Sequence, residues 1–527
     1  MIDLWPIRTA LLSVTDKTHL EALARDLYER GVTLISTGGT GAKLREWGIP
    51  FVEISQFTGH PEAFQGRMKT ISFACASALL YRRREASDEL EAAQLGIKAI
   101  DLVVCNLYRF EEAVANKSEE AKLIEEIDIG GPLMIRAAAK NFASVSVLTD
   151  PAQYGEFRSQ LTSFQGQTPF EYRRKLAARA FERIAAYDVA IAEELGQRAL
   201  ASEPRQRFLA LSEPKVLRYG ENPHQGATLY RWKNHQGKGL GEAKILQGKE
   251  LSFNNMLDAD AAWKVVSDVQ ALRPTAVAAA VIKHGNPCGL SSAPSPVEAL
   301  QKAWAGDPVS AFGGVLAIGA KVDEACAAFL SDKFIEILLA PAFDESALAL
   351  LAQKKNVRVL ELPLLAPVRA EQTLRSFSGG ILWQEEDESL SATMDAVTEL
   401  GFSAEDKALA SFGVLCAKHL KSNAIALVRS EGRSFELAGA GMGQPNRIDS
   451  LLRLALPRLK EKSLSPSDVM LISDAFFPFA DTVETAAREG IKRIVQPGGS
   501  IRDAEVIKAA NEHKVAMAFT GERHFRH

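Results

Sequence analysis

The sequence predicts a multidomain α/β protein, and three observations lead to that fold class. Short apolar runs of strand length alternate with amphipathic helical segments, and the opening region favours a mainly parallel sheet. At 527 residues the chain exceeds the size at which single hydrophobic cores stop growing, so several domains are expected. Hydrophobic residues make up 46% and charged residues 24% of the chain, as in ordinary globular proteins.

The first 200 residues contain the alternation from which the parallel sheet is predicted. Residues 9–14 and 32–36 predict strands, and the helix between them has apolar residues at helical spacing, at Leu20, Leu23, Ala24 and Leu27. Further strands are expected within 100–107 and 144–149, followed by a long amphipathic helix over 168–195.

The charge and the cysteines restrict the partners and the compartment. The net charge of −4 gives no overall basic field, so we expect neither nucleic acid nor a membrane as a partner. The five cysteines are scattered and never spaced as Cys-x-x-Cys, which favours a reducing compartment over a disulfide framework. The first residues lack a signal-peptide pattern, and no apolar run reaches the length of a membrane span. We therefore expect a cytoplasmic protein.

A glycine-rich turn, Thr37-Gly38-Gly39-Thr40-Gly41, links the second strand to a helix around residues 43–47. Such a turn exposes backbone N–H groups at a helix N-terminus, which suits a phosphate, although a tight turn needs glycine in any case. Ser13 and Lys17 in the preceding loop could converge on the same anion. They could equally be a helix cap and a solvated cation.

Three further polar segments follow: Arg67-Met68-Lys69-Thr70, Asn106-Leu107-Tyr108 and Ile127-Asp128-Ile129-Gly130-Gly131-Pro132. The last leads into an Ala-rich helix in which Arg136 and Lys140 lie one turn apart. An aspartate ahead of Gly-Gly-Pro is uncommon and could serve chemistry. A capped helix with solvated cations is the alternative interpretation.

A polar stretch without clear periodicity, residues 196–214, predicts the domain boundary. We expect one domain over 1–198 and a second region over 199–527, which is large enough for two subdomains. In this second region, strands are predicted at 277–283, 314–318, 335–340 and 469–473, alternating with Ala/Leu-rich helices.

The second region contains most of the polar turns that could hold catalytic or binding residues. A predicted strand runs into Lys283-His284, and such a pair at a strand end can supply a proton donor and a proton acceptor to one bound molecule. A histidine satisfied in a loop beside a surface lysine is the commoner outcome for an arbitrary pair. Other polar turns occur at 217–225, 307–314, 421–423, 441–447, 473–479, 496–500 and 520–527.

Eight segments, in order, resemble motifs of the bifunctional family that joins phosphoribosylaminoimidazolecarboxamide (AICAR) formyltransferase to IMP cyclohydrolase. They are KVLRYGENPHQ, GKELSFNNMLDADAAW, VIKHGNPCG, DPVSAFGG, GMGQPNRIDS, SDAFFPF, QPGGSIRD and FTGERHFRH. The resemblance is collinear over essentially the whole chain. It implies a methylglyoxal-synthase-like N-terminal domain followed by two cytidine-deaminase-like subdomains without zinc. It also implies the last two steps of purine biosynthesis, catalysed by a homodimer with formyltransferase sites at the subunit interface.

For the formyltransferase half, the resemblance implies transfer from 10-formyltetrahydrofolate to AICAR, giving the formyl nucleotide FAICAR. The implied residues are Lys283, His284 and Asn423 for catalysis, Arg218, Tyr219, Arg447, Arg523 and His527 for the nucleotide, and Phe312, Glu336 and Phe477 for the folate pocket. The 5-amino group of AICAR is a poor nucleophile because its lone pair is drawn into the ring. We expect His284 to remove its proton, and Lys283 to stabilise the oxyanion or protonate the leaving nitrogen.

For the cyclohydrolase half, the resemblance implies dehydrative closure of FAICAR to IMP. The implied residues are Lys69, Tyr108, Asp128 and Lys140 for catalysis, and Ser13, Lys17, Thr37, Gly39, Thr40, Arg67 and Thr70 for the nucleotide. We expect Asp128 to take the carboxamide proton and the other catalytic groups to polarise or protonate the formyl oxygen. Neither step then requires a metal or a redox cofactor.

The chain departs from the family pattern after Thr70. The family usually continues Leu-His-Pro-Lys-x-His-Gly-Gly, whereas residues 71–78 read Ile-Ser-Phe-Ala-Cys-Ala-Ser-Ala. We expect this apolar replacement to repack a wall and cyclohydrolase activity to survive. One alternative is a protein with formyltransferase activity alone, whose N-terminal domain has lost ring closure and only binds nucleotide. A second alternative is a catalytically silent sensor of nucleotide or folate. The intact Lys283-His284 pair disfavours the sensor, because a sensor would not need it.

Zinc chemistry is not expected. Zinc deaminases need His-x-Glu and Pro-Cys-x-x-Cys to bind and use the metal. Pro287-Cys288 is followed at the required spacing by Ser291, and His60-Pro61-Glu62 lies in the other half of the chain.

Overall fold

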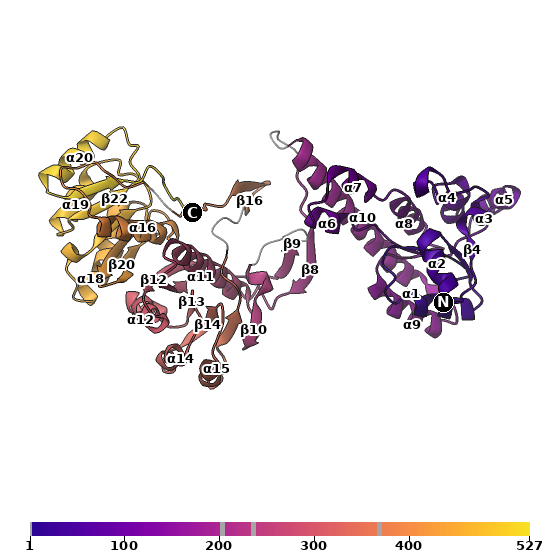
Figure 1. The fold of residues 1–527 in the computed structure, drawn as a ribbon, viewed down its shortest axis with the longest axis horizontal. Coiled ribbons are helices and arrows are strands. Elements are labelled where there is room, and N and C mark those ends of the chain that lie inside the picture. The colour runs from indigo at the N-terminus through magenta and orange to yellow at the C-terminus, as the bar shows by residue number, and fades with distance from the viewer. Residues whose placement is uncertain (1–2, 201–205, 233–238, 366–371, 391–392) are drawn as a thin grey trace. The chain divides into compact units, whose positions relative to one another are not determined.

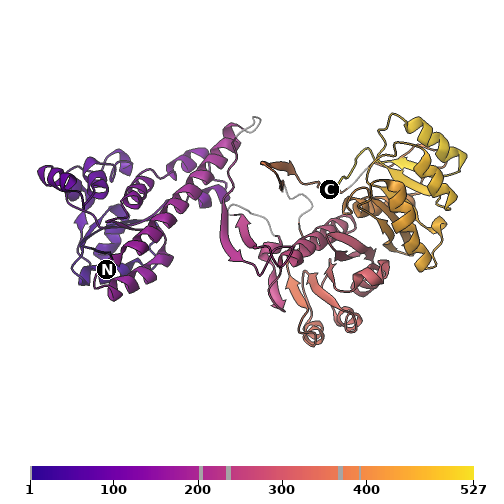
Figure 2. The same ribbon diagram turned by 180° about the vertical axis from the view of Figure 1, so that it is seen from behind.

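The computed structural model describes residues 3–200, 206–232, 239–365, 372–390 and 393–527. The chain forms two compact units, Met1–Ser212 with Trp232–Asn234 and Glu213–Arg231 with His235–His527. Each unit combines helices with a sheet, which confirms the predicted α/β fold class (Figures 1 and 2). Among the described helices, none is both long and apolar enough to cross a membrane.

The first unit is built around a five-stranded sheet with the order β4-β3-β2-β5-β6, in which every neighbouring pair is parallel. Its strands are β2 (Thr9–Val14), β3 (Thr33–Ser36), β4 (Val52–Glu53), β5 (Leu102–Asn106) and β6 (Ser146–Leu148). β1 (Leu4–Pro6) and β7 (Gln167–Pro169) form a separate antiparallel pair. The predicted parallel sheet is therefore confirmed, and its carboxyl ends form one edge.

The helices of this unit cover the sheet and enclose one apolar core. They are α1 (Leu20–Glu29), α2 (Gly38–Glu46), α3 (Ile54–Thr58), α4 (Phe73–Leu80), α5 (Ala86–Gln94), α6 (Phe110–Ala115), α7 (Glu120–Glu125), α8 (Gly130–Lys140), α9 (Tyr154–Ser163) and α10 (Phe170–Ala199). α10 is the long helix predicted over 168–195. It buries Leu176, Ala180, Ile184 and Tyr187, whose spacing places them on one face.

Residues 71–78, which depart from the family motif, lead into and form most of α4. The hydroxyl of Ser72 accepts the Cys75 N–H and caps the helix. Cys75, Ala78 and Leu79 are buried in the core, and α4 packs against α8. The segment therefore forms a wall of the core.

We expect a fragment of residues 1–198 to fold without the rest of the chain. The sheet, its helices and a core that runs from Ile7 to Ala190 all lie before the end of α10. Far-ultraviolet circular dichroism and a cooperative thermal transition are the measurements. A fragment that is insoluble or melts without cooperativity would place the domain boundary elsewhere.

The second unit is built around a twelve-stranded sheet. One half comprises β10 (Lys244–Gln247), β11 (Val277–Lys283), β12 (Asn286–Ala293), β13 (Gly314–Ile318), β14 (Ile335–Ala340) and β15 (Arg358–Glu361). The other comprises β18 (Asp395–Ala396), β19 (Ile425–Glu431), β20 (Ser434–Gly441), β21 (Met470–Ser473), β22 (Arg493–Gln496) and β23 (Ala516–Phe519). The strands predicted at 277–283, 314–318 and 335–340 coincide with β11, β13 and β14, and β21 lies within the predicted 469–473.

The two halves of this sheet repeat one topology. The order β10-β15-β14-β13-β11-β12 continues as β20-β19-β21-β22-β23-β18. Each half has an antiparallel hairpin, β11–β12 or β19–β20, beside three mutually parallel strands and an antiparallel edge strand. The halves join where β12 pairs antiparallel with β20, with Ser291 opposite Glu436. The hairpins therefore point in opposite directions along the sheet.

The helices form a layer on each face of this sheet. They are α11 (Phe253–Leu272), α12 (Pro296–Gly306), α13 (Pro308–Ala311), α14 (Glu324–Phe329), α15 (Glu345–Leu351), α16 (Ala404–Lys418), α17 (Arg447–Asp449), α18 (Leu456–Glu461), α19 (Asp481–Arg488) and α20 (Asp503–Glu512). α11 and α16 share one apolar core with both halves, whereas the opposite face has a separate core in each half. A Cβ on Gly289 would lie 1.7 Å from the Ala303 carbonyl oxygen, so only glycine allows α12 to approach β12 this closely.

The antiparallel join brings the functional segments to one edge of the sheet. Asn286 at the start of β12 lies near the end of β20, and Ile425 at the start of β19 pairs with Gly441 and Ser473. We call this the site edge, and it is formed by the turn at 284–285, the loop at 421–423 and the ends of β20 and β21.

Candidate active sites

The Lys283–His284 turn closes the β11–β12 hairpin at the site edge. The Nζ atom of Lys283 donates to the carbonyl oxygens of Phe312 and Gly313, at 3.0 and 2.8 Å. An ammonium has three donors, so a third N–H can serve a ligand. His284 is exposed and adopts a left-handed backbone, with φ 52°. Such a conformation is uncommon outside glycine and persists only where neighbours hold it.

The first turns of α11 hold this turn and the predicted folate residue Glu336. The Gly285 N–H donates to Asp258 Oδ1 at 2.7 Å, which fixes the backbone directly after His284. One turn earlier on α11, the buried Asn255 donates from Nδ2 to Glu336 Oε2 at 2.8 Å. The helix therefore ties two predicted site elements to one rigid body.

Asn254 ties the loop that contains Arg218 and Tyr219 to the same helix. Its Nδ2 donates to the Glu221 carbonyl oxygen at 3.1 Å. The guanidinium of Arg218 lies 5.4 Å from the Tyr219 ring centroid, within the range of a cation–π contact. Arg218 is exposed and Tyr219 is half-buried, so both are accessible to a ligand.

The loop that contains Asn423 is hydrogen-bonded to the start of β12, directly after the Lys283–His284 turn. The Lys421 N–H donates to Asn286 Oδ1 at 2.9 Å, so the loop before β19 is bonded to the residue that opens β12. The Nδ2 atom of Asn423 donates to the carbonyl oxygens of Gln444 and Pro445, both at 3.0 Å.

Asp474 organises the second half of the site edge. Its carboxylate is fully buried and accepts from Arg447 Nη2 at 2.8 Å and from Ser422 Oγ at 2.6 Å. Arg447, which is predicted to bind the nucleotide, is thus held by a hydrogen bond to a charged carboxylate. Hydrogen bonds between charged groups are stronger than those between neutral groups. Phe477 is fully buried in the core, so in this conformation its ring supports the wall of the site from inside.

The C-terminal residues fold onto this loop. The Ser422 N–H donates to the Arg526 carbonyl oxygen at 2.9 Å, and the His524 N–H donates to the Asp474 carbonyl oxygen at 2.9 Å. The Arg523 guanidinium lies 4.8 Å from the Phe525 ring, and the Phe525 and His527 rings lie 5.6 Å apart. Arg523 and His527 therefore lie beside the loop of Asn423, and both are exposed.

The opposite edge of the sheet, where the β19–β20 hairpin turns, is occupied by ion pairs. Arg429 Nε lies 2.5 Å from Glu436 Oε1, and Lys302 Nζ lies 2.5 Å from Glu431 Oε2 and 3.4 Å from Glu436 Oε2. These charges neutralise one another at the position that corresponds to Lys283–His284 in the other half. The two halves share one topology, but the predicted catalytic pair Lys283–His284 lies only at the site edge.

Phe312 and Phe334 form an aromatic surface next to Lys283. The Phe312 ring is 64% exposed and lies 4.9 Å from the Phe334 ring, at a tilt of 41°. A flat heteroaromatic ligand favours such a surface. Glu336 is the second residue of β14, two positions after Phe334, and is half-buried.

In the first unit, the predicted phosphate residues meet at the carboxyl ends of β2 and β3. Gly38 to Thr40 form the first turn of α2, with Thr37 as the N-cap. Ser13 Oγ and Thr37 Oγ1 lie 3.1 Å apart, and Lys17 Nζ donates to the carbonyl oxygens of Val14 and Thr15. A parallel sheet commonly binds anions at this edge, where helix N-termini present N–H groups.

Lys69 and Asp128 lie next to this anion site. Lys69 Nζ is 3.4 Å from Glu62 Oε1, and a Cβ on Gly38 would lie 3.8 Å from the same Nζ atom. Asp128 Oδ1 accepts the Gly131 N–H at 2.8 Å. Burial raises the pKa of the Asp128 carboxyl, although backbone N–H groups and the charge of Lys69 oppose the rise. Burial and the nearby Asp128 charge also raise the pKa of the Tyr108 phenol, which keeps it a proton donor.

The remaining cyclohydrolase candidates occupy different places. Thr70 touches the start of α8, since a Cβ on Gly130 would lie 2.7 Å from its Oγ1 atom. Arg67 is exposed and forms an ion pair with Glu125. Lys140 is the last residue of α8, about 15 Å along the axis from Gly130 at 1.5 Å per residue. Its catalytic role stays a prediction of the family resemblance.

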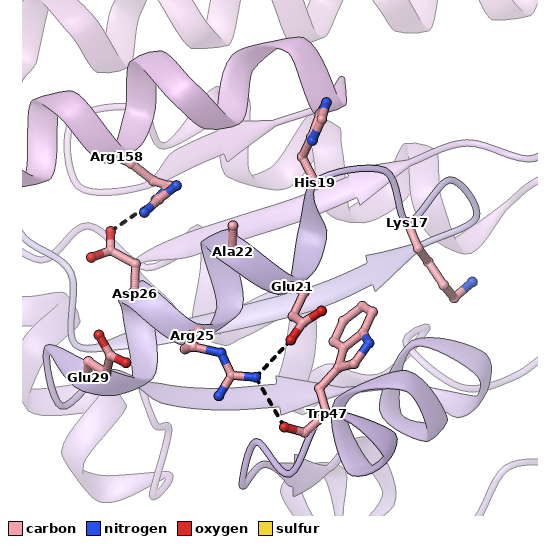
Figure 3. A pocket seen from close by; sticks show the side chains of 9 residues that line it. All are labelled: Lys17, His19, Glu21, Ala22, Arg25, Asp26, Glu29, Trp47 and Arg158. Atoms are coloured by element: carbon pink, nitrogen blue, oxygen red, sulfur yellow. Dashed lines mark hydrogen bonds and ion pairs between the residues drawn. The ribbon is translucent and has the colours of Figure 1, made fainter.

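Other ligand-binding features are weak by comparison. An open cavity of about 570 Å³ lies beside α1 and includes Lys17 and His19 in its lining (Figure 3). Its Arg25 is paired with Glu21, and its Arg158 with Asp26, so these cations are already neutralised. Within the described ranges, no group of three or more His, Cys, Asp or Glu side chains is placed to hold a metal ion.

Comparison with known proteins matches both units. The family model described as MGS-like domain matches residues 19–133, and the model described as AICARFT/IMPCHase bienzyme matches residues 138–458. The bifunctional purine biosynthesis protein PurH of Rhizobium rhizogenes is 42% identical over 531 residues, which cover 99% of this chain and 97% of that protein. The chain belongs to the AICARFT/IMPCHase bienzyme family. PurH of Synechococcus elongatus is 44% identical over 525 residues, which cover 99% of this bienzyme and all of the relative. A solved structure titled "Crystal structure of ForH" is 35% identical and has a TM-score of 0.34; the match covers 36% of this chain and 98% of that one.

These comparisons confirm the methylglyoxal-synthase-like first domain and the bienzyme assignment. Sequence reasoning about the bienzyme assigned no catalytic or binding role to three groups that hydrogen-bond to predicted site residues or their turn: Asp258, Asn255 and Asp474. Asp258 and Asn255 lie within the quoted LSFNNMLDADAAW segment, and Asp474 directly follows a predicted strand. Only their position in a motif could have singled them out.

Proposed function

We propose that this bienzyme catalyses the last two steps of purine biosynthesis, formyl transfer to AICAR and closure of the product to IMP. The observation that carries the proposal is the meeting of Lys283, His284 and Asn423 at one edge, through the 2.9 Å bond from Lys421 N to Asn286 Oδ1. The residues come from two segments, the end of β11 and the loop before β19, and such convergence of a base, a cation and an amide favours an acyl-transfer site.

In formyl transfer, the 5-amino nitrogen attacks the formyl carbon and His284 takes the proton that this nitrogen loses. Lys283 stabilises the oxyanion of the tetrahedral intermediate, because its ammonium is already oriented by the two carbonyl groups. The bond from the formyl carbon to the folate nitrogen then breaks, and that nitrogen takes up a proton. We propose 10-formyltetrahydrofolate as the donor, with Phe312 and Glu336 in its pocket.

In ring closure, the carboxamide nitrogen attacks the formyl carbon, and the formyl oxygen leaves as water with one proton from the carboxamide and one from the formamido N–H. Asp128 takes the amide proton, and a buried carboxylate with a raised pKa is a better base than an exposed one. Lys69 and Tyr108 protonate or polarise the formyl oxygen. These steps need binding, positioning and proton transfer. The family resemblance also implies Lys140, the last residue of α8, for the polarising role.

The test is to incubate the protein with AICAR and 10-formyltetrahydrofolate, and to separate tetrahydrofolate, FAICAR and IMP. Both activities together release tetrahydrofolate and IMP. Accumulation of FAICAR with no IMP would leave a formyltransferase with a nucleotide-binding remnant. Absence of tetrahydrofolate release would contradict the proposed transfer.

Replacing Asp258 by alanine is expected to reduce formyl transfer by about 10- to 100-fold, because the turn that holds His284 loses its anchor. Asp258→Asn keeps an acceptor oxygen for the Gly285 N–H and is the matched control, with a much smaller loss. Steady-state kinetics on both variants provide the measurement. Equal losses in the two variants would mean that the charge matters, and not the hydrogen bond.

We also propose a homodimer. β16 (Gln372–Phe377) and β17 (Gly380–Glu385) form a separate two-stranded sheet on which Phe377, Ile381 and Leu382 are 55%, 52% and 59% exposed. An isolated hairpin is marginally stable in water, so a second copy is the proposed cover for this surface. Light scattering should give twice the 57.3 kDa chain mass, and the double variant Ile381→Glu, Leu382→Glu should shift it toward that of one chain. A wild-type mass of one chain would contradict the proposal.

We further propose a cytoplasmic location. All five cysteines are free thiols in the structure, and four of them are buried. Free thiols persist in a reducing compartment.

A further inference from the structure

Tyr187 of α10 bonds to the backbone on both sides of Ile127, directly ahead of the Asp128 carboxylate. Its hydroxyl donates to the Glu126 carbonyl oxygen at 2.8 Å and accepts the Asp128 N–H at 2.9 Å. The residue is fully buried and lies 59 positions from Asp128 in the sequence. One hydroxyl group therefore fixes two backbone groups of the segment that presents Asp128.

The Tyr187 ring itself is held in place by packing. It contacts Phe110 edge to face, with centroids 6.3 Å apart, and the Arg183 guanidinium lies 5.5 Å from its centroid. Burial raises the pKa of the Tyr187 phenol to about 12, so the hydroxyl remains a donor at neutral pH. A buried hydroxyl of this kind must keep its partners, because water cannot replace them.

The Asp128 carboxylate is anchored separately. Its Oδ1 atom accepts the Gly131 N–H at 2.8 Å, in the first turn of α8. Without the Tyr187 hydroxyl, the Asp128 carboxylate stays bonded to the first turn of α8, while the backbone at 126–128 loses its two hydrogen bonds. The carboxylate would then change its direction relative to Lys69 and the bound nucleotide.

We propose that Tyr187 is a positioning residue for ring closure, which acts by holding the Asp128 backbone in the geometry that proton removal requires. The inference rests on the proposed cyclohydrolase activity. Tyr187 touches no reacting atom, and its role is exerted through the two hydrogen bonds. The predicted phosphate site lies at the carboxyl ends of β2 and β3, so binding and positioning are separable.

The test is Tyr187→Phe in the full chain, which keeps the ring and removes the hydroxyl. We expect kcat for closure of supplied FAICAR to fall about 10- to 100-fold, with KM changed by less than about threefold. Formyl transfer in the same chain should be unchanged and controls for the concentration of active chain, while an unchanged thermal transition controls for folding of the first unit. An unchanged closure kcat would overturn the proposal, and so would a loss confined to KM.

Tyr172→Phe is the matched control variant. Tyr172 lies on the same helix and is also buried, but among the described residues its hydroxyl has no hydrogen-bond partner. Its loss should leave closure unchanged. A loss of closure equal to that of Tyr187→Phe would mean that any buried hydroxyl on α10 has the same effect, which contradicts a specific role for Tyr187.

Hydrogen–deuterium exchange separates this inference from the proposed activity. In Tyr187→Phe, the peptide that spans residues 124–133 should exchange at least about fivefold faster, and in Tyr172→Phe it should not. If the wild-type protein does not close FAICAR, the proposed cyclohydrolase function fails, and the exchange result still decides whether Tyr187 holds the Asp128 segment. Unchanged exchange in Tyr187→Phe overturns the proposal.

Discussion

Replacing His284 by alanine is expected to lower the rate of formyl transfer by about 10²–10⁴-fold, the usual contribution of a general base. The imidazole is the proposed acceptor of the 5-amino proton, and it is presented by a turn that Asp258 and Lys283 hold from both sides. Closure of supplied FAICAR should be unaffected, because Asp128 and its neighbours belong to the other compact unit. The assay measures tetrahydrofolate release and IMP formation in separate reactions.

His513→Ala is the control for the His284 variant. His513 is an exposed histidine in the same unit, at the end of α20 and three residues before the start of β23. Because β23 is parallel to β22 and β21, its start lies at the edge opposite the site edge. Full transfer activity in His284→Ala would remove this histidine from the mechanism. Loss in both variants would point to a general effect of histidine removal.

Replacing Asp128 by asparagine is expected to reduce ring closure by about 10²–10⁴-fold while formyl transfer remains intact. Asparagine keeps an oxygen that can accept the Gly131 N–H, so the local structure is retained and only the base is lost. The measurement supplies isolated FAICAR to the wild type and to Asp128→Asn, with Lys69→Ala and Tyr108→Phe in parallel. If the wild type forms IMP no faster than buffer, the first domain is a binding remnant.

The pH dependence of closure follows from the raised pKa of Asp128. The ionised carboxylate is the active form, so the rate falls as the pH drops through this pKa. Because burial has raised that pKa, the loss of activity begins at a higher pH than for a solvent-exposed aspartate. Asp128→Asn should show no such acid limb. An acid limb at the ordinary aspartate position would contradict the role of burial.

The change at residues 71–78 shows how far local chemistry could be interpreted from sequence. Small and apolar side chains predicted a packing role, and α4 indeed buries Cys75, Ala78 and Leu79. The pattern did not show that Ser72 caps this helix or that it packs on α8, the helix that begins beside Asp128. Packing partners depend on sheet topology, which local periodicity does not encode.

The sequence by itself determined the strands and the reactive residue types. β11, β13 and β14 coincide with the predicted runs, because apolar periodicity is a local property of a strand. The resemblance to the bienzyme family likewise implied Lys283, His284, Asn423 and Asp128 as candidates.

Only the tertiary structure decided which of these groups meet and what holds them. The decisive hydrogen bonds join residues 27, 59 and 135 positions apart: Gly285 to Asp258, Asp128 to Tyr187, and Lys421 to Asn286. It also placed Lys140 at the far end of α8 from Asp128. The physical reason is that such contacts follow from the antiparallel joining of two repeated half-sheets and from the packing of α10, and neither leaves a short-range pattern in the chain.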